Sequence, residues 1–368
     1  FRNNYCFIGN KKRVKSLLRE IILWQKRHGY PFTLSTEASI NLARDDELLD
    51  LMVEAGFLMV FVGIESPVKE SLAGAGKSQN LKGDLLAGIE KIQRRGIEVT
   101  GGFIIGFDTD PENIFELQKE FIAKSFVPTA MIGLLMALPG TQLYRRLEKE
   151  KRILGDSQGN NTHVFDMNFI PVLPKEKVLR GYRDVLKEVY DPWHYFKRCL
   201  GLLKRFPRER GHFPGMRSRY ASIAELKALF RSLFRQGFSR YGFQYFRFIL
   251  GAVRINPRLF NRAVGMAVEG YHFFRITKEI LRAACFNDYL EEKVDLFRRR
   301  LETAPALSLD RRTLGGLADY GRLIKNGAKR RYRRLGAGAR AYAEESMERF
   351  ESVMDRLIGS AKGALARR

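Results

Sequence analysis

The feature that most constrains this chain is an alternation of apolar runs with amphipathic segments over its first 150 residues. The apolar runs lie at 30–39, 57–66, 97–107 and 129–138, and one stretch of helical periodicity separates each run from the next. A continuous apolar run such as FLMVFVGIES is typical of a strand buried on both faces of a parallel sheet. Strands that alternate with amphipathic helices predict a parallel α/β sheet or barrel.

Local start and stop signals define the predicted helices. One of the two acids at 45–46 is expected to cap a helix that Gly56 ends. Asp110 and Pro111 are interpreted as the cap and the first-turn proline of a helix over 111–125.

Polar residues follow each predicted strand at its carboxyl end, where parallel α/β folds bind their ligands. They are Glu37, then Glu65 and Ser66, then Gly106, Phe107 and Asp108, and finally the segment 138–141. A single acid at such a position is also explained as a helix cap. Four successive polar strand ends favour a binding site.

The third apolar run contains glycines four residues apart, Gly102 and Gly106. Glycine weakens the interior of a strand, so it usually marks a bulge or a close approach to the backbone. Either a ligand lies against the backbone here, or the glycines admit close packing within the protein.

Composition restricts the class of protein. The chain has 368 residues, and its three cysteines, Cys6, Cys199 and Cys285, are too far apart for a zinc or CxxC motif. We expect no metal ligands in this chain. No apolar run reaches the roughly 18 residues of a spanning helix. We expect a cytoplasmic protein, with a peripheral position at a membrane surface as a further expectation.

The second half is strongly basic and is predicted to be helical throughout. Residues 1–173 hold 22 basic and 21 acidic residues, whereas 174–368 hold 43 and 20. Aromatic residues alternate with arginine over 222–302. These features fit an anionic membrane surface. They also fit RNA, which is less favoured because no RNA-module signature is present. A helical accessory domain with solvated basic faces is the alternative.

Several motifs in series resemble the radical S-adenosylmethionine superfamily, in particular the branch whose full chains often carry a cobalamin-binding domain. They are FIGNKKRVKSLL, TEASINLARDDELLDLMVEAGF, VFVGIES, GGFIIGFDTDP and ALPGTQLY. The resemblance covers residues 7–150 and continues into 160–205. It implies a partial parallel (β/α) barrel of radical SAM type over 1–150, an irregular connection over 151–173 and an all-α basic accessory domain over 174–368.

The resemblance also implies where S-adenosylmethionine binds. The family's GxIxGxxE pattern maps onto Gly102, Ile104 and Gly106, near the adenine, and its final acid falls at Thr109, next to Asp108. The ribose-contacting strand end maps onto Glu65 and Ser66, and Glu37 lines the same cavity. A further loop contains the expected substrate or cofactor contacts Lys77, Gln79 and Asn80.

One departure concerns the iron–sulfur cluster. The family holds a 4Fe-4S cluster on a CxxxCxxC loop after the first strand, and this chain contains no such motif. We therefore expect the first strand and the cluster ligands upstream of Phe1, and we expect this chain alone to be inactive.

The resemblance implies an enzyme that cleaves S-adenosylmethionine reductively, either for radical chemistry or for cobalamin-assisted methyl transfer to an unidentified substrate. An electron donor such as a ferredoxin or flavodoxin would serve it, and cobalamin is an expected cofactor of the full-length protein. The alternative functions are a truncated fold without catalysis and a binding module for an anionic surface.

Overall fold

The structure is a computed structural model, and it describes most of the chain. The described residues are 7–74, 78–81, 83–155, 157, 167–207, 230–303 and 311–366. The chain divides into two compact units, Phe1–Phe274 and Arg275–Arg368.

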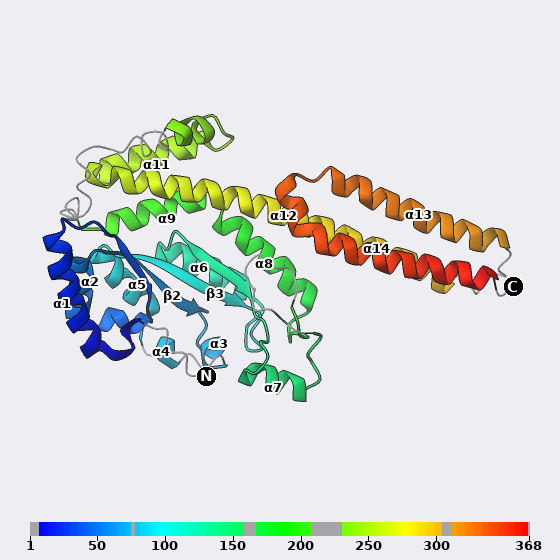
Figure 1. Cartoon of the computed structure of the whole chain (residues 1–368), viewed down its shortest axis with the longest axis horizontal. Helices are drawn as coiled ribbons and strands as arrows, with labels where there is room; N and C mark the ends of the chain where they lie inside the picture. Colours follow the sequence, from blue (N-terminus) through cyan, green and yellow to red (C-terminus); the bar gives the residue numbers. More distant parts are fainter. Residues whose placement is uncertain are drawn as a thin grey trace. The chain divides into compact units, whose positions relative to one another are not determined.

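A four-stranded parallel sheet lies at the centre of the first unit (Figure 1). The strand order follows the sequence, and all three neighbouring pairs are parallel. The strands are β1 (Leu34–Glu37), β2 (Phe57–Glu65), β3 (Glu98–Ile105) and β4 (Ala130–Leu134). The predicted parallel α/β fold with four strands, the first ending at Glu37, is confirmed.

Helices connect the strands and continue the first unit beyond β4. Those of the sheet region are η1 (Phe7–Asn10), α1 (Lys11–Arg27), η2 (Ile40–Arg44), α2 (Asp46–Ala55), α3 (Lys69–Gly74), α4 (Ser78–Leu81), α5 (Leu85–Arg94), α6 (Ile114–Ser125) and α7 (Gln142–Lys149). Those that follow are α8 (Lys175–Val189), α9 (Pro192–Arg205), η5 (Leu233–Gly237), α11 (Gly242–Ile255), η6 (Pro257–Leu259) and α12 (Phe260–Thr303). The predicted change to helices alone after residue 174 is confirmed for the described residues.

The two faces of the sheet differ in burial. On β3, Val99, Phe103 and Ile105 point to a face that is fully buried, and Phe103 packs edge-on against Phe121 of α6. Gly102 and Ile104 point to the opposite face and are only half-buried. A strand alternates its side chains between two faces. Therefore one face belongs to the core. On the other face Glu98 and Thr100 are also buried, and only Gly102 and Ile104, toward the carboxyl end, are half-buried. We call this second face the concave face, after the predicted partial barrel.

Helix caps explain where several helices begin and where α2 ends. Asp45 accepts a hydrogen bond from the backbone N–H of Leu48, and Gly56 ends α2 with a left-handed φ of +97°. Both were predicted. The prediction for Asp110 is wrong, because α6 begins at Ile114 after Asn113. The side chain of Asp110 instead binds backbone groups of the preceding loop.

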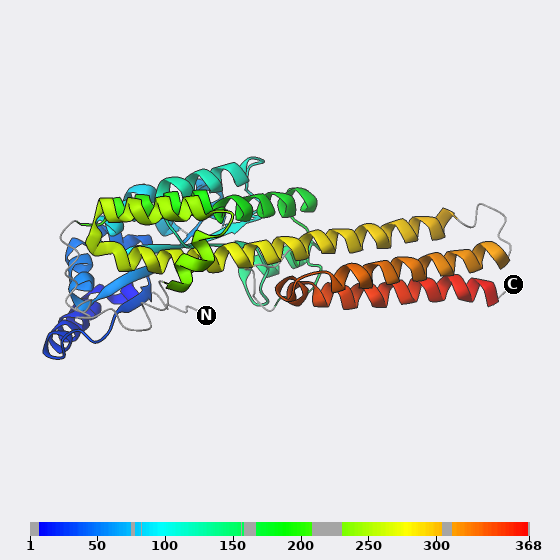
Figure 2. The same cartoon turned by 90° about the horizontal axis from the view of Figure 1, so that it is seen from above.

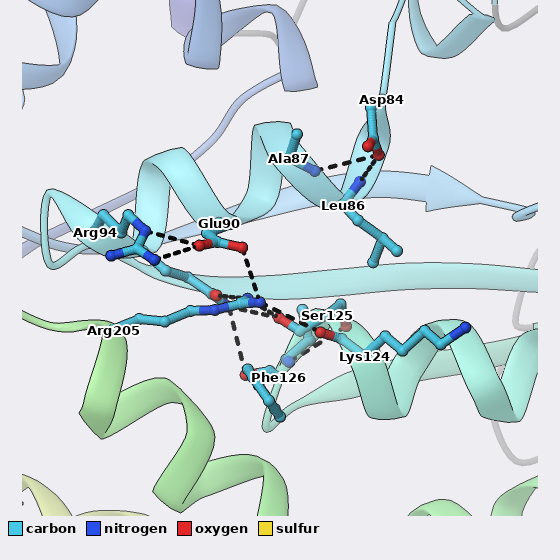
Figure 3. Close-up of polar contacts among 11 residues, drawn as sticks. Asp84, Leu86, Ala87, Glu90, Arg94, Lys124, Ser125, Phe126 and Arg205 are labelled. Carbon is cyan, nitrogen blue, oxygen red and sulfur yellow. Dashed lines mark hydrogen bonds and ion pairs between the residues drawn. The ribbon is translucent and has the colours of Figure 1, made fainter.

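Two arginines of α9 attach this helix to the sheet region. Arg205 donates to Gln93 and Glu90 on α5 and to the carbonyl of Ser125, at the end of α6 (Figure 3). The buried Arg198 donates to three backbone carbonyls, those of Val127, Pro128 and Val189. The helices after residue 174 therefore begin as part of the same compact unit as the sheet. The predicted segment boundaries at 150 and 174 stay a prediction.

The second unit has its own core, built from the later part of α12 together with α13 (Arg311–Arg333) and α14 (Ala337–Ala366) (Figure 2). Its buried side chains include Phe286, Phe297, Phe350 and Met354. No helix among the described residues combines the length and the apolar character that a membrane span requires.

Candidate functional site

The carboxyl ends of β1, β2 and β3 bring the predicted binding residues to one edge of the sheet. Glu37 is the last residue of β1 and is exposed, whereas Glu65, the last residue of β2, and Ser66 are buried. Gly102 and Ile104 lie on the concave face of β3. The sequence thus predicted which residues share this rim. Their contacts with a cofactor stay a prediction.

The end of β2 has a strained backbone. Glu65 has a φ of +66°, in the left-handed region that favours glycine. A non-glycine residue there costs about 1–2 kcal/mol, and such strain concentrates at functional sites. The backbone N–H of Ser66 donates to the carbonyl of Ile64 at 2.9 Å, and the Ser66 hydroxyl accepts from the N–H of Val68 at 3.2 Å. These contacts fix a tight turn directly after the strand.

Two buried amide side chains donate hydrogen bonds to backbone carbonyls near the carboxyl ends of β2 and β3. Asn80 of α4 donates to the carbonyls of Gly63 and Ile64, at 3.0 and 3.1 Å. Gln118 of α6 donates to the carbonyls of Glu65 and Ile104, at 3.3 and 3.1 Å. Buried backbone carbonyls that are not paired within the sheet need a hydrogen-bond donor from a side chain or from water. Asn80, predicted as a loop contact for substrate or cofactor, holds the backbone of β2 in this structure.

Packing within the protein explains why glycine occupies position 102 in β3 and position 106 just after it. A Cβ on Gly102 would lie 2.8 Å from Cζ of Phe61, on the neighbouring strand. Gly106 has a φ of +111°, and a Cβ there would lie 2.8 Å from Cε of Met167. The two glycines therefore leave room for the side chains of Phe61 and Met167. Gly63 pairs with Gly102 in the register, so the concave face also has two adjacent positions without side chains.

Asp110 is a rim residue whose role the sequence pattern did not reveal. Its Oδ2 accepts from the backbone N–H groups of Gly106 and Phe107, at 2.8 and 3.0 Å, and its Oδ1 accepts from the hydroxyl of Ser71 at 2.6 Å. Burial raises the pKa of this carboxyl, although the three hydrogen bonds oppose the rise. An acid does follow the glycine pattern of β3, one residue after the position that the family pattern predicts.

Asp108 forms ion pairs with two arginines. Its Oδ2 lies 2.7 Å from Arg146 on α7, and its Oδ1 lies 2.5 Å from Arg152. Burial alone would raise the pKa of Asp108, but the hydrogen bonds from Arg152 and Arg146 outweigh it and hold the pKa below its ordinary value. Arg152 also donates to the carbonyl of Ile170. The side chain of Asp108 therefore connects the rim to the segment after α7.

Asn168 holds the backbone beyond the fourth strand. Its Oδ1 accepts from the N–H of Ala137 at 2.9 Å, and its Nδ2 donates to the carbonyl of the same residue at 2.7 Å. The roles of four residues of this region were missed in the sequence, and what they share is a polar side chain at a buried position: Asn80, Asp110, Gln118 and Asn168. The sequence does not reveal burial at single positions in loops and short helices.

Two candidate residues, Lys77 and Gln79, remain. Lys77 is outside the described residues, and Gln79 lies in α4. Within the described ranges, no group of three His, Cys, Asp or Glu side chains is placed to bind a metal ion. Two surface hollows, of about 330 and 220 Å³, are lined by α1 and by η2 with α5. Neither hollow includes Glu37, Glu65 or Gly102.

Comparison with known proteins connects this fold to methyltransferases. The chain is 37% identical over 293 residues to the uncharacterized methyltransferase sll1242 of Synechocystis, a match that covers 78% of this chain and 54% of that protein. It is 38% identical over 206 residues to the hopanoid C-2 methylase of Rhodopseudomonas palustris, covering 56% of this chain and 37% of the methylase. The chain is a homologue of these methyltransferases. These methyltransferase relatives agree with the resemblance found in the sequence, to the cobalamin-associated branch of radical S-adenosylmethionine proteins.

More distant similarities are also present. The bacteriochlorophyllide d C-12(1)-methyltransferase of Chlorobaculum tepidum is 26% identical over 164 residues, covering 44% of this chain and 35% of that enzyme. Residues 141–284, from α7 into α12, match the family described as a domain of unknown function (DUF4070). A solved structure of the radical S-adenosylmethionine methyltransferase TsrM from Kitasatospora setae superposes with a TM-score of 0.39 at 17% identity, covering 73% of this chain and 52% of TsrM.

This methyltransferase homologue spans only part of the length of its relatives, 54% of the Synechocystis protein and 37% of the hopanoid methylase. The homology therefore supports membership of an enzyme family. It does not identify the substrate.

Proposed function

We propose that this chain forms the S-adenosylmethionine-binding part of a radical methyltransferase. The observation that carries the proposal is the homology to methyltransferases over 293 residues, a stretch long enough to include the open face of the sheet as well as the helices beyond it. The alternative, a fold that only binds a ligand or an anionic surface, predicts no methyl transfer by the natural full-length protein.

The residues on the concave face fit S-adenosylmethionine in shape and charge. Gly63 and Gly102 are adjacent positions without a side chain, and the ring of Phe61 lies beside Gly102. In this proposal an adenine ring lies against the backbone next to Phe61 and hydrogen-bonds to backbone groups. Carboxylates at the ends of β1 and β2 complement a ligand that carries sulfonium and ammonium charges. In this proposal Ile104 contacts the adenine, Glu65 and Ser66 contact the ribose, and Glu37 lines the cavity.

The residues of this chain do not fit the 4Fe-4S cluster. Such a cluster needs closely placed cysteine thiolates, and the three cysteines of the sequence are separated by more than 80 residues each. We propose that its ligands, and the site for cobalamin, belong to a longer natural protein. In such a protein the cluster would supply an electron taken from a donor such as a ferredoxin or flavodoxin, and cobalamin would carry the methyl group.

Calorimetry on this chain tests the binding part of the proposal. S-adenosylmethionine should bind, and Glu37→Gln should weaken the affinity about fivefold or more by removing an exposed carboxylate at the rim. Glu148→Gln removes an exposed carboxylate from α7 and serves as the matched control. Equal affinities for the two variants would contradict the placement of Glu37, and no binding by the parent chain would contradict the proposed site.

Activity is tested on the natural full-length protein after anaerobic reconstitution. The expected products from S-adenosylmethionine are S-adenosylhomocysteine and a methylated compound in extracts of the source organism. Binding without either product would favour the non-catalytic alternative.

A further inference from the structure

The helix α11 is apolar on two opposite faces. Its inner face, with Tyr245, Phe248 and Ala252, is buried against the first unit. The residues on its outer face are Phe243, Phe246, Leu250 and Val253, spaced by three or four positions and all exposed. A surface helix normally presents polar residues on its outer face. The packing of the described residues therefore does not explain this second apolar stripe.

The stripe continues onto the preceding segment. Phe230, Phe234 and Phe238 are also exposed, and the rings of Phe234 and Phe238 lie 6.0 Å apart. The ring of Phe246 approaches Gly237, where a Cβ would lie 2.9 Å from its Cζ, so η5 and α11 share one surface. We call residues 230, 234, 238, 243, 246, 250 and 253 the phenylalanine ridge. Of the six exposed phenylalanines in the described part of the chain, five belong to it.

Arginines surround the ridge without acidic neighbours in sequence. Residues 230–268 contain seven arginines and no lysine, aspartate or glutamate. Only Arg262 among them has an ion pair with a described residue, through Glu98 and Glu269. Arg247 instead lies over the ring of the exposed Trp193, 4.4 Å from its centre. The arginines other than Arg262 give this surface a positive charge that no described carboxylate balances.

We infer that the phenylalanine ridge docks this protein onto an anionic lipid bilayer. A bilayer surface offers both parts that the ridge needs, an acyl region for phenylalanine and leucine, and anionic headgroups for the surrounding arginines. Arginine stems are long enough to reach headgroups while the rings lie deeper. Tryptophan prefers the headgroup level, which suits Trp193 at the edge of the ridge.

The position of α11 in the fold allows this contact. Figure 1 shows α11 at the outer side of the first unit, where it packs against α9. Its 14 residues provide a stripe about 20 Å long. RNA is a poorer fit, because leucine and valine in the stripe do not stack on bases and no strand platform is present among the described residues of this region.

Vesicle flotation with the whole chain tests the inference. Neutral phosphatidylcholine vesicles are compared with vesicles containing about 30% phosphatidylglycerol, which should bind the protein at least tenfold more strongly at low salt. The ridge variant replaces three residues by serine, namely Phe234, Phe238 and Phe243. Its matched control replaces three exposed apolar residues elsewhere by serine, namely Leu154, Val172 and Leu323.

The ridge variant should lose at least tenfold of its partition into anionic vesicles, because three apolar side chains no longer enter the bilayer. The control variant should change less than twofold. Circular dichroism verifies that both remain folded, as expected for exposed positions. A ridge variant that binds like the parent chain would overturn the inference.

A second pair of variants separates this surface from the general positive charge of the chain. The first variant replaces Arg235, Arg240 and Arg254, near the ridge, by glutamine. The second replaces Arg330, Arg333 and Arg334, on and just after α13, by glutamine. Each arginine near the bilayer should contribute about fivefold at low salt, and the loss should shrink as salt shortens the Debye length. Equal losses in the two variants would mean diffuse attraction and would overturn the assignment to the ridge.

Tryptophan fluorescence reports insertion directly. The chain has two tryptophans, so Trp24→Phe leaves Trp193 as the single reporter. Brominated acyl chains in anionic vesicles should quench Trp193 in this background. Adding the three ridge substitutions to the same background should abolish the quenching, and quenching that persists would overturn the inference.

The rival occupants give different results. If a second copy covers the ridge, sedimentation shows a dimer that the ridge variant dissociates, and vesicles do not bind. If RNA is the ligand, excess single-stranded RNA displaces the chain from vesicles. Either result would overturn the inference.

Discussion

Replacing Asp110 by alanine should lower the free energy of unfolding substantially. The carboxylate accepts hydrogen bonds from the N–H groups of Gly106 and Phe107 and from the hydroxyl of Ser71. Asp110 is only 7% exposed, so water replaces few of these contacts. At about 1–1.5 kcal/mol for each donor left without a partner, the loss is about 3–4.5 kcal/mol.

The asparagine variant separates hydrogen bonding from charge. In Asp110→Asn the remaining oxygen still accepts from both N–H groups, because both bind the same atom, Oδ2. The new amide nitrogen takes the place of Oδ1 and donates to Ser71, whose hydroxyl rotates to accept. The expected loss for this variant is below about 1 kcal/mol.

Thermal unfolding followed by circular dichroism measures both variants. For a unit of this size, about 1 kcal/mol corresponds to roughly 2–4 °C in Tm, so Asp110→Ala should unfold roughly 6–18 °C lower. A Tm within about 2 °C of the parent chain for Asp110→Ala would refute the reasoning. An Asp110→Asn variant as unstable as the alanine variant would show that the charge, and not the hydrogen-bond geometry, is required.

Three further predictions concern the same unit. The pKa of Asp108 is lowered in the folded state, so the stability that this carboxylate contributes is complete above its unfolded pKa near 3.8 and is lost as the pH falls through its folded pKa. Urea unfolding as a function of pH should show this loss of stability at acid pH. The Asp108→Asn variant should not show that pH dependence. Arg198→Met should lower the free energy of unfolding by about 2–4 kcal/mol, because three buried carbonyls lose their donor. An unchanged urea midpoint would contradict this. Gly102→Val should cost about 1–3 kcal/mol by pushing Phe61 aside, and it should also block S-adenosylmethionine in calorimetry. A stable variant with unchanged affinity would contradict both effects.

The sequence by itself determined most of the secondary structure and the parallel α/β class of the fold. Apolar runs of strand length, helical periodicity and caps such as Asp45 and Gly56 are local signals, because they depend on neighbours within a few residues. Parallel strands place their carboxyl ends on one edge, so the rim that includes Glu37 and Glu65 was also predicted. The motifs that resemble the radical S-adenosylmethionine superfamily are also short stretches, so the resemblance could be found in the sequence alone.

Only the tertiary structure decided what individual polar groups and apolar faces do. Asp110 precedes a proline and looks like a helix cap, but its partners come from α3 and from the end of β3. The sequence predicts close approach at Gly102 but does not show that the ring of Phe61 lies beside it. The sequence of α11 is apolar on both faces, so it cannot state which face is buried. Burial and hydrogen-bond partners depend on residues far away along the chain, and local patterns carry no information about them.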